Sequence, residues 1–333
     1  MNKKNINCIL FNGLGGAGQR HLRIFRKLLP KVRFVCSRKI GKTPLLNSNF
    51  TINKSTNLSK EYNIEFFNNI EDAYKTKPDI SVIATPSSNH FNDCMIALNN
   101  NSNVFVEKPG PISKVEIIKL RKNLLMKNKH FFISFQRRFH PLVLKFKKLI
   151  DNKSIGKINL IRVQTSSFVP FWHPYEDFSN LYAVNKNLGG GVINTEIHEI
   201  DLLNWIFGKP KKIFSIISKR SDYKINVEDQ AEILIDYNKF AAQISLSFMK
   251  KIQKRHIIVE GSKGEIKLDF ISENLIITNN QLKHKKYFLP CDNESLFYLQ
   301  NKFYLNNINK IKNIYIDSAL ENANFIEKVK HLD

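Results

Sequence analysis

Residues 12–30, "NGLGGAGQRHLRIFRKLLP", carry the pattern that decides the fold of the first half of the chain. Three glycines in the spacing G-x-G-x-x-G follow the short apolar run 6–11, "INCILF". These glycines are Gly13, Gly15 and Gly18. Apolar side chains then recur at helical spacing until Pro30, where a helix cannot continue. The pattern predicts a buried strand, a glycine-rich turn and a helix.

A turn of this kind is typical of dinucleotide-binding sites. Gly13 would permit the tight turn, and Gly15 would let a pyrophosphate approach the backbone. Gly18 would let the helix pack closely on the strand, while the helix N-terminus faces the anion. A glycine-rich turn without a ligand is the alternative. We therefore predict cofactor contacts at five positions of the turn: Gly13, Gly15, Gly16, Ala17 and Gly18.

The next predicted strand, residues 32–39, "VRFVCSRK", bears on which dinucleotide binds. Sites specific for NAD usually place Asp or Glu at the end of this strand, where it holds the ribose 2′-hydroxyl. This sequence has Ser37 and Arg38 there, and no acid. A hydroxyl and a guanidinium suit a 2′-phosphate, so we expect NADP, with NAD as the alternative. Arg38 could instead stack on adenine or point into solvent.

Strand and helix patterns alternate through the rest of the first half, which predicts a doubly wound parallel sheet. Ligands of such sheets lie beyond the carboxyl ends of the strands. Two strands end at 84–90, "ATPSSNH", and at 107–109, "EKP". We therefore expect an NAD(P)-binding Rossmann domain over 1–130, with further cofactor contacts at Thr85, Pro86, His90, Glu107 and Lys108.

The composition narrows the class of protein. A length of 333 residues suggests two domains. The net charge of +23 comes from lysines spread along the chain, without a nucleic-acid-binding motif, so we expect a solvated basic surface and no nucleic-acid partner. No apolar run approaches the ~18 residues of a membrane span. The four cysteines form no CxxC pair, which argues against a metal site or disulfides and favours the cytoplasm.

The pattern changes after residue 130. Short strand-like runs separated by turn residues predict a mostly antiparallel sheet, and 318–332, "SALENANFIEKVKHL", predicts a closing helix. We therefore expect an α/β chain whose second, α+β domain covers 131–333, and whose last helix could pack back on the first domain.

The motifs in this order resemble the Gfo/Idh/MocA family, the glucose–fructose oxidoreductase and inositol dehydrogenase group of NAD(P)-dependent enzymes. The resemblance rests on the glycine turn, "ATPSSNH", "EKP", "FQRRFHP" (135–141), the block 172–208 and "VEGSKGEIKLDF" (259–270). The block 172–208 is most similar to members from bacterial surface-sugar gene clusters. The resemblance implies a second domain with an open sheet that binds substrate, covers the nicotinamide and often mediates oligomers, so we expect a homodimer or homotetramer.

The resemblance also implies that Lys108 and His198 are catalytic. The family's E-K-P lysine is its proposed proton-transfer residue, and the histidine relays the proton or holds a substrate hydroxyl. To accept a proton, Lys108 needs a pKa that falls toward neutrality, through partial burial and the positive nicotinamide. Pro109 would lock the backbone, conceivably through a cis peptide bond.

The sequence departs from the family just before His198. Relatives commonly carry an aspartate three or four residues earlier, where this chain has Thr195 and Asn194. Apolar residues recur at helical spacing after the glycines of this block and predict a helix that ends at Gly208. Helical spacing would place either residue on the face of His198, and both can hydrogen-bond a hydroxyl. A role as carboxylate base is thereby in doubt.

Aromatic and basic side chains around these positions suit a sugar ring that bears a phosphate or carboxylate. Arg138 is equally compatible with a structural salt bridge, and His173 and Tyr175 share the aromatic loop. The predicted substrate contacts are Lys108, Arg138, Trp172, Tyr182, Asn194 and His198.

The leading hypothesis is an NAD(P)-dependent oxidoreductase acting on a secondary alcohol or ketone of a sugar or nucleotide-sugar in bacterial surface glycan biosynthesis. A redox-assisted NAD-dependent glycosidase is one alternative, and it would hold its cofactor tightly. A noncatalytic nucleotide-binding sensor or regulator is the other.

Overall fold

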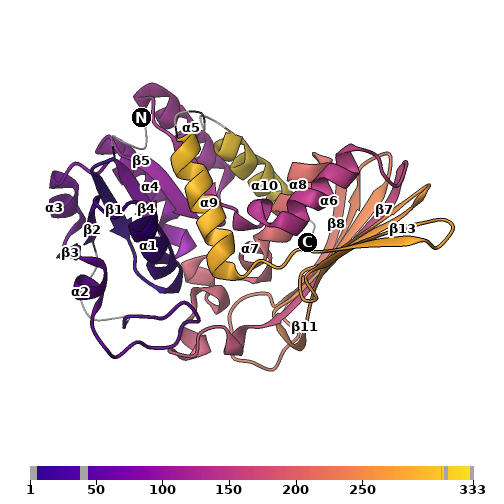
Figure 1. Ribbon diagram of the computed structural model, residues 1–333, viewed down its shortest axis with the longest axis horizontal. Coiled ribbons are helices and arrows are strands. Elements are labelled where there is room, and N and C mark those ends of the chain that lie inside the picture. Colours follow the sequence, from indigo (N-terminus) through magenta and orange to yellow (C-terminus); the bar gives the residue numbers. More distant parts are fainter. Residues whose placement is uncertain (1–5, 38–43, 309, 311–313, 331–333) are drawn as a thin grey trace.

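The computed structural model describes residues 6–37, 44–308, 310 and 314–330, and it contains two sheets in separate lobes (Figure 1). The first lobe holds a six-stranded parallel sheet in the order β3-β2-β1-β4-β5-β6. Its strands are β1 (Cys8–Asn12), β2 (Arg33–Ser37), β3 (Ile64–Phe67), β4 (Ile80–Ile83), β5 (Asn103–Glu107) and β6 (Phe131–Ser134). The order reverses between β1 and β4, which is where ligands of doubly wound sheets bind.

Five helices connect these strands: α1 (Gly16–Leu28), α2 (Leu58–Tyr62), α3 (Ile70–Lys75), α4 (His90–Asn99) and α5 (Lys114–Lys127). The asparagine-rich composition has a local use at their ends. Asn57 and Asn69 cap the N-termini of α2 and α3 with their side-chain oxygens. Asn63 and Asn128 end α2 and α5 in the left-handed conformation, which asparagine adopts more readily than most residues.

The second lobe is an eight-stranded sheet in the order β14-β13-β12-β11-β7-β10-β9-β8. All neighbouring strands are antiparallel except β7 and β10, which run parallel. The strands are β7 (Ile158–Phe168), β8 (Lys212–Ser218), β9 (Gln230–Asp236), β10 (Ala241–Ser247), β11 (Met249–Gly261), β12 (Gly264–Asp269), β13 (Asn274–Asn279) and β14 (His284–Phe288).

The remaining helices are α6 (Pro141–Asp151), α7 (Val192–Thr195), α8 (Ile197–Phe207), α9 (Asn293–Asn307) and α10 (Ile314–Lys330). Helix α6 packs on the second sheet, and α10 packs on α8 and on α5 of the first lobe. Helix α9 lies along α1, where Arg23 and Glu294 form a two-pronged ion pair with both N–O distances at 2.9 Å (Figure 1). The predicted return of the last helix to the first domain is seen in the packing of α10 on α5, and α9 returns as well.

Two predicted boundaries differ in detail from the structure. Strand β6 belongs to the parallel sheet, so that sheet continues past residue 130. The helix predicted after the glycines ends as expected at Gly208, where φ is +83°, but it is interrupted at Glu196. Asn194 therefore lies in α7 and His198 in α8, and the four-residue spacing does not place them on one helical face.

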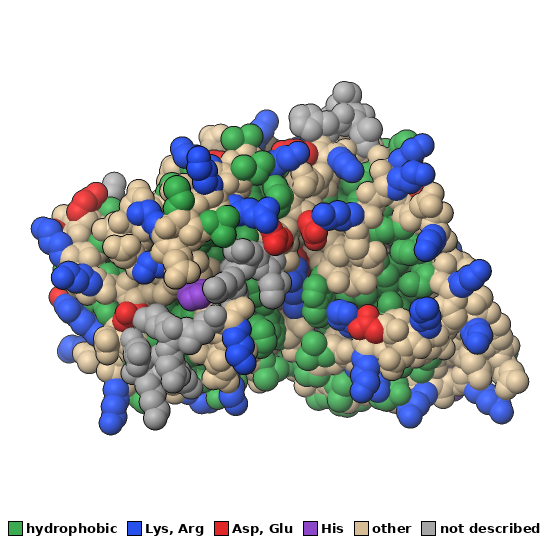
Figure 2. All heavy atoms as spheres, turned by 90° about the horizontal axis from the view of Figure 1, so that it is seen from above, with side chains coloured by type: hydrophobic (Ala, Val, Ile, Leu, Met, Phe, Trp, Pro, Cys, Tyr) green, Lys and Arg blue, Asp and Glu red, His purple; other side chains and the backbone are tan. Residues whose placement is uncertain are grey.

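Basic residues are dispersed on the face drawn in Figure 2, where blue side chains lie over both lobes among neutral ones. Within the described residues, no helix is long and apolar enough to cross a membrane. The same part of the chain holds no group of three or more His, Cys, Asp or Glu that could bind a metal ion.

Candidate active site

The glycine turn has the geometry that a pyrophosphate cradle requires. Gly13 has φ +87°, and a β-carbon there would lie 2.7 Å from the Ala84 carbonyl oxygen. A β-carbon at Gly18 would lie 2.3 Å from the Gly13 carbonyl oxygen, so helix and turn touch backbone to backbone. At Gly15, by contrast, a β-carbon would meet no atom of the described residues within 4 Å. Gly15 faces open space, as a residue approached by a ligand should.

Helix α1 also offers an anion its free amide groups. Gly15 is the N-cap and has no side chain to cap the helix, and within the described chain no acidic residue lies in the first turn. The positive end of the helix dipole is therefore not neutralised by the protein. Gly15, Gly16 and Ala17 would hold the pyrophosphate, which is the group that the resemblance implies.

The 2′-phosphate prediction is only partly visible in the structure. Ser37 ends β2 beside Asn12, half-buried at the carboxyl edge of the sheet. Arg38 lies outside the described residues. Ser37 is thus placed at the edge where a ribose would lie, and the role of Arg38 stays a prediction.

Other predicted cofactor contacts fasten the ligand-side loops to one another. His90 is buried, with Nε2 2.9 Å from the Thr85 carbonyl oxygen and Nδ1 3.2 Å from the Gly110 carbonyl oxygen. The Thr85 hydroxyl donates to Asp93 at 2.6 Å. Pro86 starts the 3-10 turn 87–89. His90 therefore joins the loops that follow β4 and β5, which is a positioning role.

Glu107 is directed into the protein. One carboxylate oxygen lies 2.6 Å from Nε2 of buried His21 on α1, and the other accepts the Lys108 backbone N–H at 3.1 Å. Burial alone would raise the pKa of Glu107, but His21 and Lys108 outweigh it and the pKa lies below its usual value. Asn301 on α9 lies 3.1 Å from the other nitrogen of His21. Glu107 thus anchors the end of β5, and both carboxylate oxygens have protein partners.

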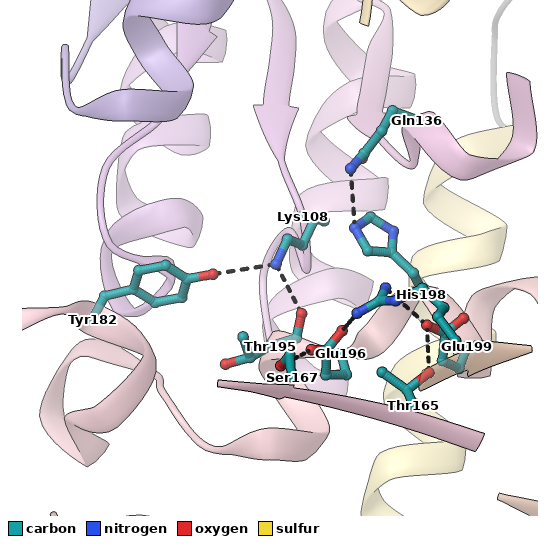
Figure 3. Close-up of polar contacts among 10 residues, drawn as sticks. Lys108, Gln136, Thr165, Ser167, Tyr182, Thr195, Glu196, His198 and Glu199 are labelled. Carbon is teal, nitrogen blue, oxygen red and sulfur yellow. Dashed lines mark hydrogen bonds and ion pairs between the residues drawn. The ribbon is translucent and has the colours of Figure 1, made fainter. Parts of the chain in front are cut away.

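Lys108 follows at the ligand side, and its peptide bond to Pro109 is cis, as the sequence suggested. Its ammonium donates to the Thr195 carbonyl oxygen at 2.8 Å and to the Tyr182 hydroxyl at 3.2 Å (Figure 3). Burial alone would lower the pKa of Lys108, but Tyr182, Glu107 and Glu196 together raise it above its usual value. The protein groups around Lys108 thus act against the expected fall toward neutrality, and the effect of the positive nicotinamide stays a prediction.

His198 is the opposite case. It is buried, and burial together with Lys108, Arg137 and Arg255 holds its pKa well below the usual range. Its Nε2 lies 3.2 Å from the amide nitrogen of Gln136 (Figure 3). Among the described residues its Nδ1 has no hydrogen-bond partner. His198 is thus a neutral imidazole whose buried Nδ1 has no partner among the described residues.

Buried charges underlie this pair, and the sequence analysis missed them. Arg255 bridges two carboxylates, at 2.6 Å from Glu196 and 3.0 Å from Glu199. Ser167 donates to Glu196 and Thr165 to Glu199 (Figure 3). Arg255 lies in the middle of a strand, and no sequence motif marks it. The two acids that flank His198, Glu196 and Glu199, were a signal, because buried carboxylates need a cation nearby.

Arg138 is engaged elsewhere. It is 6% exposed and binds Asp201 through two hydrogen bonds of 2.6 and 2.8 Å, and Asn322 on α10 donates to the same carboxylate. Its guanidinium also lies over the ring of Trp205. This is the structural salt bridge that the sequence left open, and it supports no substrate contact through the two bonded nitrogens.

The remaining predicted substrate residues separate in space. Asn194 donates to the carbonyl oxygens of Gly189 and Gly190, and it lines a cavity of about 790 Å³ whose lining includes neither Lys108 nor His198. Trp172 is partly buried against the core. Within the described residues, Tyr182 is the one member of the predicted set whose side chain hydrogen-bonds the Lys108 ammonium, and Thr195 contacts the same ammonium through its carbonyl oxygen.

Two family models match most of the chain. Residues 8–133 match the oxidoreductase family with an NAD-binding Rossmann fold, and residues 143–267 match the GFO/IDH/MocA C-terminal domain. The chain belongs to the Gfo/Idh/MocA family. It is therefore an oxidoreductase with an NAD-binding Rossmann domain.

Curated relatives and solved structures agree with this assignment. The chain is 24% identical over 246 residues to trans-1,2-dihydrobenzene-1,2-diol dehydrogenase of Xenopus tropicalis, covering 72% of this chain and 71% of the relative. It is 23% identical over 226 residues to myo-inositol 2-dehydrogenase of Thermotoga maritima, covering 64% and 65%.

Two solved structures superpose over nearly the whole chain. UDP-N-acetylglucosamine 3-dehydrogenase of Acidithiobacillus ferrooxidans gives a TM-score of 0.76 at 15% identity, covering 98% of this chain and 97% of that one. An oxidoreductase of Agrobacterium radiobacter in complex with NAD+, L-tartaric acid and magnesium gives 0.79 at 14% identity, covering 98% and 96%. They confirm the predicted two-part fold.

The contrast between Gly15 and Gly18 is testable. Gly18→Ala should lower the free energy of unfolding by about 3 kcal/mol, because backbone atoms must move apart. Gly15→Ala should cost about 1 kcal/mol or less, as a poorer helix cap, and should weaken dinucleotide binding by about tenfold or more. Urea unfolding and a fluorescence titration with NADH and NADPH measure both. Equal losses of stability in the two variants would contradict the assignment.

Proposed function

We propose that this family member interconverts a secondary alcohol and a ketone on a sugar or nucleotide-sugar. The observation that carries the proposal is the pairing of cationic Lys108 with neutral His198 at the ligand edge of the parallel sheet. The bound nicotinamide supplies or accepts the hydride. The protein must then give a proton to the substrate oxygen or take one from it.

The charge states favour Lys108 as the proton donor when a ketone is reduced. Its ammonium is held by Tyr182 and by the Thr195 carbonyl oxygen, so its direction is fixed before substrate arrives. His198, with a free Nδ1 among the described atoms, can hold a substrate hydroxyl or exchange a proton with it. In the oxidation direction Lys108 must first lose its proton, which its raised pKa opposes.

The substrate class rests on the relatives. Their names include dehydrogenases of myo-inositol and of UDP-N-acetylglucosamine, which are a polyol and a nucleotide-sugar. Neutral hydrogen-bonding groups beside Lys108, rather than a second carboxylate, suit hydroxyl-rich rings. We place the reaction in surface glycan biosynthesis on the similarity of block 172–208. A redox-assisted glycosidase would use the same residues, and it would release a hydrolysed glycoside instead of a ketone.

The pH dependence tests the proton donor. With a ketone substrate and NADPH, kcat/KM should stay flat between about pH 6 and 9 and fall only as pH rises through the raised pKa of Lys108. The low pKa of His198 adds no limb near neutrality. Lys108→Met should lower kcat/KM by about 10²–10⁴-fold.

The matched control for that variant is Lys122→Met, an exposed lysine on α5, which should retain wild-type activity. A wild-type limb near pH 7 that disappears in Lys108→Met would instead show that the lysine titrates near neutrality.

We propose NADP as the preferred cofactor, on Ser37 and Arg38. Arg38→Ala should weaken NADPH binding by about tenfold or more and leave NADH binding within about twofold, because the charge acts on the 2′-phosphate alone. Arg33→Ala is the control, since Arg33 on the same strand is exposed and paired with Glu65. Equal losses for both dinucleotides would exclude the 2′-phosphate contact.

We also propose that the open face of the second sheet joins copies of the chain. Phe214 and Leu234 are direct cross-strand neighbours on β8 and β9, each 57% exposed, with Ile216 beside them at 64%. Such an apolar patch on a strand pair is typical of an interface. Leu234→Glu should therefore reduce the mass seen by sedimentation, whereas Leu125→Glu on α5 should not. An unchanged mass in Leu234→Glu would rule out this face.

A further inference from the structure

One segment of the second lobe touches the loops that follow β2, β4 and β5 of the first lobe. This segment, residues 169–191, runs from the end of β7 to α7, and we call it the connector. His173 and Tyr175 lie against Phe50, Tyr182 binds Lys108, and the Gly189 carbonyl oxygen accepts the Ser87 hydroxyl at 3.2 Å. Residues grouped with the sugar site in sequence therefore lie at three different places.

The first of these places is the dinucleotide turn. The rings of His173 and Tyr175 are stacked, with centroids 5.2 Å apart and planes at 17°. The Phe50 ring packs on both, at 5.4 and 6.4 Å between centroids. His173 is held in turn by Glu176, whose carboxylate lies 2.8 Å from Nδ1. The aromatic pair is thus a fixed unit rather than a loose loop tip.

This unit covers the first residue of α1. A β-carbon at Gly16 would lie 2.9 Å from the Phe50 ring and 3.3 Å from the Tyr175 hydroxyl oxygen. The Tyr175 hydroxyl also lies 3.2 Å from Nδ1 of His173, which holds it beside the Gly16 backbone. A hydroxyl oxygen therefore stands at one of the amides that would otherwise face a pyrophosphate oxygen.

A positive charge completes the surroundings. The Arg20 guanidinium, one turn into α1, lies 4.5 Å from the centre of the Phe50 ring and 4.8 Å from that of Phe297. Within the described residues its Nε has no hydrogen-bond partner. Phe50 is therefore held between Arg20 and the His173–Tyr175 pair, beside the first residue of α1.

We propose that Tyr175 is a positioning residue that closes the dinucleotide site from the second lobe. Its hydroxyl occupies the Gly16 amide in the free protein and donates to the pyrophosphate in the complex. His173 and Phe50 hold the phenol in place, so the dinucleotide leaves only when the connector lifts. The inference needs a bound dinucleotide, and it does not depend on which alcohol the enzyme oxidises.

The chemistry of the phenol fits this role. Burial and Glu176 raise the pKa of Tyr175, so the hydroxyl stays protonated and can donate to an anion. Because the same connector carries Tyr182 to Lys108, lifting it would also remove a partner of the catalytic ammonium. The protein would then not exchange its dinucleotide while Tyr182 holds the Lys108 ammonium.

The test is the rate of dinucleotide release from the full chain. NADPH is bound, chased with excess NADP+, and followed by nicotinamide fluorescence in a stopped-flow instrument, with NADH run in parallel. Release should be about tenfold faster in Tyr175→Phe, which loses one charge-assisted hydrogen bond. It should be faster still in Tyr175→Ala, where association should also accelerate because the cover is gone.

Tyr237→Phe is the matched control, since within the described chain its buried hydroxyl has no partner and it lies in the β9–β10 turn. Thermal unfolding checks that each variant is folded. If Tyr175→Ala does not fold, Phe50→Leu removes the supporting ring and should accelerate release in the same way. Release within twofold of wild type, or slower, in the folded variants would overturn the proposal. So would wild-type release in Tyr175→Phe with only the substrate KM raised, because Tyr175 would then be a sugar contact.

Discussion

A carboxylate buried at the end of β5 is the constraint on which the site depends. Glu107 must be paired there, and its partner His21 comes from α1, the helix that begins at the dinucleotide turn. Asn301 of α9 lies within hydrogen-bond distance of the same histidine. A helix that follows the second sheet in the chain therefore helps to hold a strand end of the first sheet. With its carboxylate turned inward, the strand end presents the next residue, Lys108, to the second lobe. Turn, strand end and lysine are therefore set by one hydrogen-bonded chain.

Charged residues of the second lobe determine the charge balance around Lys108. Glu196 and Glu199 are buried beside Arg255, so neither acid is free to act as a base. Glu196 nevertheless helps to keep Lys108 protonated, while Lys108, Arg137 and Arg255 help to keep His198 neutral. Burial is the largest cause of the low pKa of His198, and the neighbouring cations act in the same direction, whereas the buried carboxylate of Glu196 raises the pKa of Lys108.

Much of the fold could be predicted because its signals are local. The glycine turn, the end of α8 at Gly208 and the change from alternating elements to short strands are all visible within a few residues. The lysine and histidine came through the family resemblance. The features that the sequence did not reveal depend on residues distant in the chain. The pKa of Lys108 is raised by Tyr182 and Glu196. The Tyr175 ring packs on Phe50, over a hundred residues earlier. Arg138 was ambiguous because an arginine alone does not reveal its carboxylate.

The parallel pairing of β7 with β10 has a consequence for how such an enzyme can change. These two strands are neighbours in the sheet, yet the connector, α7, α8 and the strands β8 and β9 lie between them in the chain. Most of the segments through which the second lobe reaches the ligand side therefore lie between these two paired strands in the chain. The pairing of β7 with β10 can be kept while the sequence of the segments between them changes for a new substrate. Solved structures that share only 14–15% sequence identity with this chain and still superpose over nearly all of it are what we expect when the strand pairing is kept and the sequence changes.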